Sequence, residues 1–222
     1  MAIPSRQIGW GTEDNLLWQI SKQLERLTCV TAGGCGAIAT TTTTSTTAAP
    51  AYKVFTALLT QSGGDNIQDI TTGDLIIGTT YQISRGGGGA GADFTIVGAP
   101  NNDQFTNFIA TGTTPVWGTS GELSYNTGAP VATVLENTIG NVWFTYNYIG
   151  TYGVNSDGLF TSNKTTTFIQ NATDDANNNS TNIAFGQDEY NIQIITAANV
   201  GGIFSDYDGL LYNNSIEIRV YN

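Results

Sequence analysis

The spacing of apolar residues near the start of the chain predicts one amphipathic helix. Four apolar side chains recur at intervals of three, four and three residues: Leu17, Ile20, Leu24 and Leu27. This is the a and d spacing of a coiled coil, so the four would form one buried seam. Because isolated helices shorter than roughly 12 to 15 residues are marginal in water, this helix needs a partner surface. We expect an oligomerisation helix; the alternative is that the seam packs against the chain's own β-rich part.

After the helix the pattern changes twice. Residues 32–50 are rich in Thr, Ala and Gly, without charge or periodicity, which is typical of a linker. From residue 51 onward, short segments alternate apolar and polar residues between Gly, Asn and Asp turns. We therefore divide the chain into an anchor segment with the helix at 1–31, a linker at 32–50 and a β-rich body at 51–222.

The clearest strand is the last one. In segment 216–221, Ile, Ile and Val alternate with Glu, Arg and Tyr, so one set should face a core and the other should face away. Segment 142–148 alternates similarly, as do Ile192 and Ile194. These patterns predict a mainly β fold, with an antiparallel β-sandwich or jelly-roll-like body preceded by the coiled-coil helix.

Several segments carry a resemblance. Residues 3–27 read IPSRQIGWGTEDNLLWQISKQLERL; segments 52–63 and 128–138 are similar to paired strands of one β-domain, and 92–99 and 108–115 to a small module. Together they resemble virion structural proteins of tailed bacteriophages, particularly crAss-like phages and relatives that infect Bacteroidetes. In such proteins the module is often inserted in the β-domain. The resemblance therefore implies a small inserted β module at 64–127, between flanking segments that would join directly without it.

The resemblance also implies a function. It implies a head or tail fibre, or a decoration protein, located in the virion and assembled in the cytoplasm of the bacterial host. We expect a homotrimeric head fibre or decoration spike, held to the major capsid protein or another virion protein by Arg6, Ile8 and Trp10. Trimerisation is favoured by Leu17 and Ile20 at a and d positions and by the likeness to fibres. The alternatives are a host-glycan-binding adhesin, which is a receptor-binding tail fibre, and a carbohydrate-cleaving spike.

The charge distribution argues against some partners. The net charge is -11, and the whole excess lies beyond residue 31, where four Lys and Arg face 15 Asp and Glu. Nucleic acid is not an expected partner, because phosphate binding needs clustered cations. No membrane partner is expected either, since no stretch approaches the roughly 18 apolar residues of a membrane span, and the first residues lack signal-peptide features.

Candidate chemistry is sparse. The chain has no histidine, which excludes Ser-His-Asp and Cys-His arrangements and His-ligated metals within one chain. Carboxylate pairs occur at 174–175, at 188–189 and in the turn Asp206-Tyr207-Asp208-Gly209. We interpret this last segment as an ordinary Asp-rich turn rather than as a calcium site. We therefore expect no enzyme activity, no cofactor and no metal.

Two cysteines, a glycine motif and several aromatic residues are further candidate features of the chain. Cys29 and Cys35 are expected as free thiols, with a disulfide as the alternative. The glycines at 86, 88 and 91 match G-x-G-x-x-G, yet segment 94–97 reads as a strand where a phosphate loop needs a helix start. Five aromatic residues could form a glycan-stacking platform, although core packing competes with that interpretation: Trp117, Trp143, Tyr146, Tyr148 and Tyr152.

Overall fold

The protein is described by a computed structural model that covers residues 20, 21, 23, 24, 51–85, 91–171, 180–186 and 188–222. Its contacts divide the chain into two compact units, residues 1–48 and 49–222. In the first unit the four described residues are helical. The rest of the predicted seam, the three predicted anchor residues and both cysteines lie outside the described residues: Leu17, Leu27, Arg6, Ile8, Trp10, Cys29 and Cys35.

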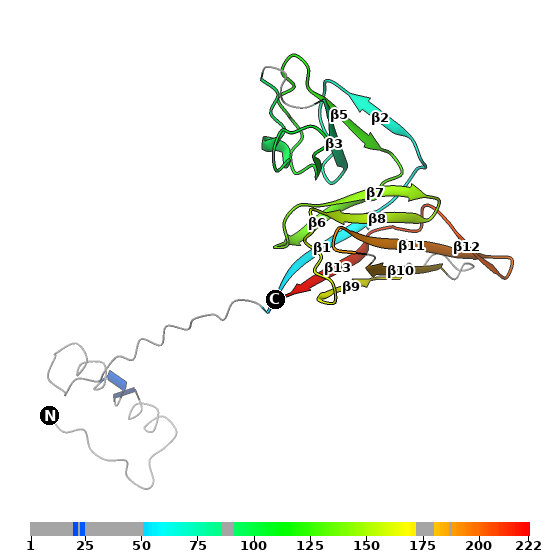
Figure 1. Ribbon diagram of the computed structural model, residues 1–222. Coiled ribbons are helices and arrows are strands. Elements are labelled where there is room, and N and C mark those ends of the chain that lie inside the picture. Colours follow the sequence, from blue (N-terminus) through cyan, green and yellow to red (C-terminus); the bar gives the residue numbers. More distant parts are fainter. Residues whose placement is uncertain (1–19, 22, 25–50, 86–90, 172–179, 187) are drawn as a thin grey trace, which may run out of the picture. The chain divides into compact units, whose positions relative to one another are not determined.

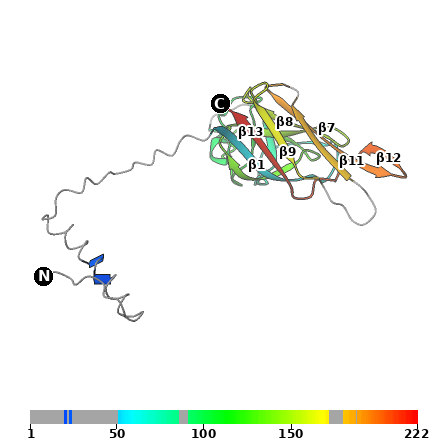
Figure 2. The ribbon, with the colours of Figure 1, turned by 90° about the horizontal axis from the view of Figure 1, so that it is seen from below.

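The second unit is mainly β, with antiparallel strands (Figure 1). One sheet has the order β6-β1-β13-β9, with bounds Val131–Asn137, Tyr52–Thr60, Asn214–Tyr221 and Thr165–Ile169. The other has the order β10-β11-β8-β7, with bounds Ser180–Gly186, Asn191–Val200, Thr151–Ser156 and Val142–Tyr148. Strand β12 (Ile203–Asp206) pairs with residues 197–200 at the end of β11, on the side of the body opposite the C-terminus of the chain (Figure 2).

These two sheets enclose one apolar core. Its largest contributors from the strands include Phe55 and Leu59 of β1, Phe144 of β7 and Tyr152 of β8, all essentially buried. The predicted alternation in 216–221 is confirmed, because Ile216, Ile218 and Val220 are buried and the residues between them are not. Two antiparallel sheets around a shared core are consistent with a β-sandwich. We call this part the two-sheet body.

A third sheet lies between β1 and β6 in the sequence, and we call residues 61–130 the module. Its order is β2-β5-β3-β4, with bounds Ile67–Ile70, Glu122–Asn126, Thr80–Arg85 and Asn107–Ile109. The module has its own core, which includes Tyr81, Phe94, Phe108 and Leu123. The strands on either side of it pair directly, with Leu59 opposite Ala132. The chain therefore leaves the body after β1 and returns beside the same strand.

Strand β4 joins the module to the body. Its Phe108 belongs to the module core, whereas the next residue, Ile109, belongs to the body core, as the two-residue period of a strand allows. Hydrogen bonds add to this contact: Ala132 N donates to the Gly78 carbonyl over 2.9 Å, and Phe144 N donates to Thr80 Oγ1 over 3.0 Å. These contacts set the position of the module against β7.

One predicted strand is wrong. Residues 94–97 do not form a strand; Thr95–Val97 is a short 3₁₀ helix. The Asp93 carboxylate accepts hydrogen bonds from the Thr95 hydroxyl at 2.7 Å and from Thr95 N at 2.9 Å, which also lower the pKa of Asp93. Gly98, at a φ of 112°, then turns the chain. A local side-chain hydrogen bond has therefore overridden the strand preference of Thr, Ile and Val.

Candidate ligand-binding groove

A groove of about 220 Å³ lies between the module sheet and β7 of the body. Strands from both parts line it: Ile67, Thr80, Gln82, Asn107, Ser124, Tyr125, Asn126, Ala129, Phe144, Thr145 and Tyr146. None of these residues is Asp, Glu, Lys or Arg, although the described part of the chain beyond residue 50 is strongly acidic. The groove is therefore lined by hydroxyl groups, amides and rings.

The module wall follows from strand alternation. Tyr81, Ile83 and Leu123 point into the module core, so Gln82 and Ser124 point from the opposite face. The register places Gln82 beside Ser124 of β5 on one side and beside Asn107 of β4 on the other. We call Ser124, Gln82 and Asn107 the polar row.

The polar row is partly free to bind. Gln82 Nε2 donates to Asn107 Oδ1 over 3.2 Å, which holds both amides in place. Within the described part of the chain, the Ser124 hydroxyl has no hydrogen-bond partner. The Gln82 amide also keeps hydrogen-bonding capacity, because one such side chain carries two donors and one acceptor oxygen. The row can therefore donate to and accept from a ligand's hydroxyl groups.

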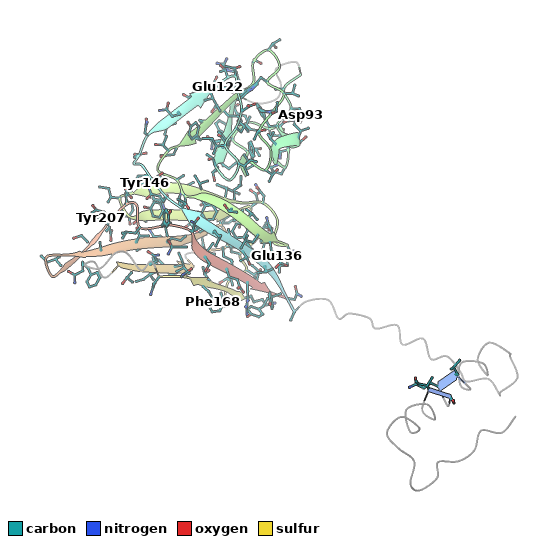
Figure 3. The ribbon with its side chains drawn as sticks, turned by 180° about the vertical axis from the view of Figure 1, so that it is seen from behind. Asp93, Glu122, Glu136, Tyr146, Phe168 and Tyr207 are labelled. Carbon is teal, nitrogen blue, oxygen red and sulfur yellow. The ribbon has the colours of Figure 1, made fainter. Side chains whose placement is uncertain are left out.

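The body wall is held by Asp208. The Tyr146 hydroxyl donates to Asp208 Oδ2 over 3.0 Å, and the Tyr152 hydroxyl and Gly150 N donate to Oδ1 over 2.9 and 2.7 Å. Burial first, and Asp208 second, raise the pKa of both tyrosines. Tyr146 lies on the side of the body that faces the module (Figure 3). The ring of Tyr146 is thus fixed at the edge of the groove.

The Asp-rich turn serves this arrangement. Asp206 is exposed at the end of β12, whereas the Asp208 carboxylate accepts the three donors described above. The following residue, Gly209, donates its N–H to Gln61 Oε1 over 2.5 Å, and Gln61 Nε2 reaches the Gly128 carbonyl at 3.2 Å. The turn therefore positions Tyr146 and ties the C-terminal part of the body to the start of the module. Among the described residues, no three His, Cys, Asp or Glu side chains gather as metal ligands would.

The five aromatic residues do not gather into one platform, which was the alternative to core packing. Trp117 packs edge-on against Phe94 in the module core, with ring centroids 5.7 Å apart. Tyr146 and Tyr152 turn toward Asp208, and Trp143 packs against the body core. A bulge in the pairing with β8 separates Tyr148, which is exposed, from the rings before it. These five side chains serve different parts of the fold.

Two of the four cations beyond residue 31 lie beside carboxylates. Arg219 pairs with Glu217 and stacks on the rings of Tyr52 and Phe168, at 4.9 and 5.3 Å from their centroids. The hydrogen bond to Glu217 is the main cause that raises the pKa of Arg219. Arg85 lies 3.9 Å from Glu122. Neither arginine adds to a positive patch.

Sequence reasoning did not single out the polar row. Its signal was present in the alternation of Gln82 with Tyr81 and Ile83, but which strand lies beside it depends on pairing between distant segments. Of the predicted seam, the structure describes Ile20 and Leu24, which are 45% and 57% exposed. No helix formed by described residues has the length and apolar character needed to cross a bilayer. Comparison of the chain with protein-family models, curated proteins and solved structures returned no match.

Proposed function

We propose that the protein is a structural component of a phage particle, a trimeric head fibre or decoration spike anchored through its N-terminal segment. In this proposal residues 1–31 anchor and trimerise the chain, residues 32–50 link, and residues 51–222 form a jelly-roll-like β-sandwich with its inserted module. The partners are two further copies and the major capsid protein or another virion protein. No catalytic role is part of the proposal.

The observation that carries the assembly proposal is the exposure of Ile20 and Leu24, the two seam residues that the structure describes. Ile20 is 45% exposed on a helical segment within a unit that is compact by itself. A large aliphatic side chain at a predicted d position gains about 1.5 to 3 kcal/mol when it is buried fully. The resemblance of residues 3–27 to virion proteins adds the phage context, and the acidic body argues against a role on nucleic acid.

The first prediction tests the seam. Ile20→Asp combined with Leu24→Asp should convert the oligomer to monomers of 23.5 kDa, because two carboxylates would be buried without partners in each copy. Light scattering gives the mass, and circular dichroism should show an unchanged β-body. Ser21→Asp, which carries one charge beside the seam, is the control. An unchanged mass in the double variant would reject the stem and favour packing of the helix on its own chain.

A second candidate function, a host-glycan-binding adhesin, is favoured by the groove. Sugars present several hydroxyl groups and apolar C–H faces, and proteins bind them with amides, hydroxyl groups and rings. The polar row and Tyr146 supply these groups. Because the groove has no cation and the body is acidic, a neutral saccharide fits better than an acidic one.

The second prediction tests the groove. On an array of neutral and acidic glycans, the full chain should bind neutral saccharides, and Gln82→Ala should weaken binding about tenfold or more by leaving a ligand hydroxyl unpaired. Gln68→Ala changes the same residue type on exposed β2, at a position that does not itself line the groove, and should bind like the wild type. Binding that survives Gln82→Ala, or no binding at all, would reject the adhesin and leave a passive decoration protein.

A further inference from the structure

Four of the five strands of the second sheet, β10, β11, β8 and β7, carry no charged side chain, and the short fifth strand β12 ends with Asp206. The opposite sheet has Lys53, Glu136, Glu217 and Arg219 in its strands. Exposed faces of soluble proteins are rich in charge, and depletion of charge marks the centre of protein interfaces. The contrast therefore points to the outer face of the second sheet, which we call the neutral face.

Register defines what the neutral face exposes. Ile192 and Ile194 point into the body core, so Gln193 and Ile195 point outward. Ile183 lies opposite Ile195, and Phe185 lies opposite Gln193, which puts both on the same face. Ile183 is 53% exposed and Phe185 is 41% exposed. Tyr148 joins this surface through its hydroxyl, 3.5 Å from Gln193 Nε2.

The polar groups of the neutral face are bonded to one another. Asn191 Nδ2 donates to Asn155 Oδ1 over 2.7 Å, and Asn155 Nδ2 donates to Thr145 Oγ1 over 3.1 Å. This network closes over Gly153, where a Cβ atom would lie 2.5 Å from Thr145 Oγ1. Because these groups already have partners within the chain, covering the face costs less desolvation than covering free amides.

We infer that the neutral face is a contact between the bodies of two copies of this chain. The inference rests on the proposed stem, which would bring bodies together. Two acidic bodies repel each other wherever their charged surfaces meet, so their contact should form where charge is missing. A different protein that carries cations would gain binding energy from the acidic surface of the body, whereas this face has no charge to attract it. The nearest carboxylates lie at the ends of its strands, as in a polar rim: Asp188 and Glu189 lie between β10 and β11, and Asp206 lies opposite Ala197 near the end of β11.

The third prediction measures dissociation of the full chain in a dilution series by analytical ultracentrifugation. Phe185→Asp should raise the concentration at which the oligomer dissociates about tenfold or more, because it buries an unpaired carboxylate. Phe168→Asp is the matched control on the opposite sheet, where Phe168 is 52% exposed, and should dissociate like the wild type. Equal dissociation of Phe185→Asp and the wild type would overturn the contact.

Two further arms separate the contact from the stem. If Phe185→Asp unfolds, Ile183→Thr with Phe185→Thr keeps strand-favouring uncharged residues and should still promote dissociation. Should Ile20→Asp with Leu24→Asp keep the wild-type mass while the neutral-face variants dissociate, the stem fails and the contact stands. Should the stem variant dissociate while neither neutral-face variant does, the contact fails and the stem stands. A wild type that is monomeric at every concentration overturns the contact.

Discussion

At the scale of single residues, Asp208 organises more of the fold than its place in an Asp-rich turn suggests. Its carboxylate accepts hydrogen bonds from Tyr146, Tyr152 and Gly150, which come from β7, β8 and the turn between them. Charge-assisted hydrogen bonds of this kind are worth about 1.5 to 3 kcal/mol each. The same carboxylate therefore stabilises the body and holds one edge of the groove.

The fourth prediction concerns the pH dependence of this cluster. Burial raises the pKa of Tyr152, so the folded protein holds its phenolic proton more tightly than the unfolded chain does. The contribution of Tyr152 to the free energy of unfolding is fully present below the ordinary tyrosine pKa of about 10. As the pH rises above that value, this contribution falls by about 1.4 kcal/mol per pH unit. Tyr152→Phe should be less stable at neutral pH by about 1 to 3 kcal/mol, yet lose less on alkaline titration.

Urea unfolding between neutral pH and about pH 11 measures both effects. Tyr212→Phe alters the most exposed tyrosine of the described chain and should follow the wild type throughout. An equal alkaline loss of unfolding free energy in Tyr152→Phe and the wild type would show that another group controls the transition.

Residue patterns predicted burial where a strand has one buried face. Ile216, Ile218 and Val220 follow the two-residue period because any slip would move all three to the other face. Tyr148 broke the same rule, because a bulge shifts the pairing of β7 with β8 after Tyr146. Bulges leave no reliable mark in a single sequence, so this exposure could not be read from alternation.

At the scale of elements, the mainly β fold was predictable and its local exceptions were not. The strand expected at 94–97 failed because Asp93 bonds to Thr95, a contact between neighbours that competes with pairing. The groove needed more than local information. Gln82 and Asn107 meet because β3 pairs with β4, and Thr145 faces them because the module docks on β7. Sequence periodicity indicates the face of each strand but not its neighbour.

The helix marks the opposite case. Its seam was predicted from spacing alone. Ile20 is exposed in the described structure, so burial of this side chain against a partner would be favourable. The printed chain shows that segments 142–148, 151–156, 180–186 and 191–200 lack charged residues, but not that they pair in one sheet. The neutral face emerged only when pairing placed Ile183, Phe185 and Ile195 on one surface.

At the scale of the whole molecule, the two proposed contacts would have different roles in assembly. The stem would hold copies together through a short seam, and the neutral face would fix how the acidic bodies meet. The charged sheet is part of neither contact, but Thr145 both lines the groove and accepts a hydrogen bond from Asn155 in the network of the neutral face. The groove and the neutral face therefore adjoin each other at Thr145 of β7.

The fifth prediction tests the central claim, that the chain is a virion protein anchored by its N-terminal segment. Phage particles purified from cells that produce this chain would be labelled with a gold-conjugated antibody against residues 51–222 and imaged by electron microscopy. We predict gold at a fixed site on each particle, lost without damage to the capsid when residues 1–11 are deleted. Unlabelled particles, with the protein recovered only from the soluble lysate, would contradict the account, and full labelling after the deletion would contradict the anchor.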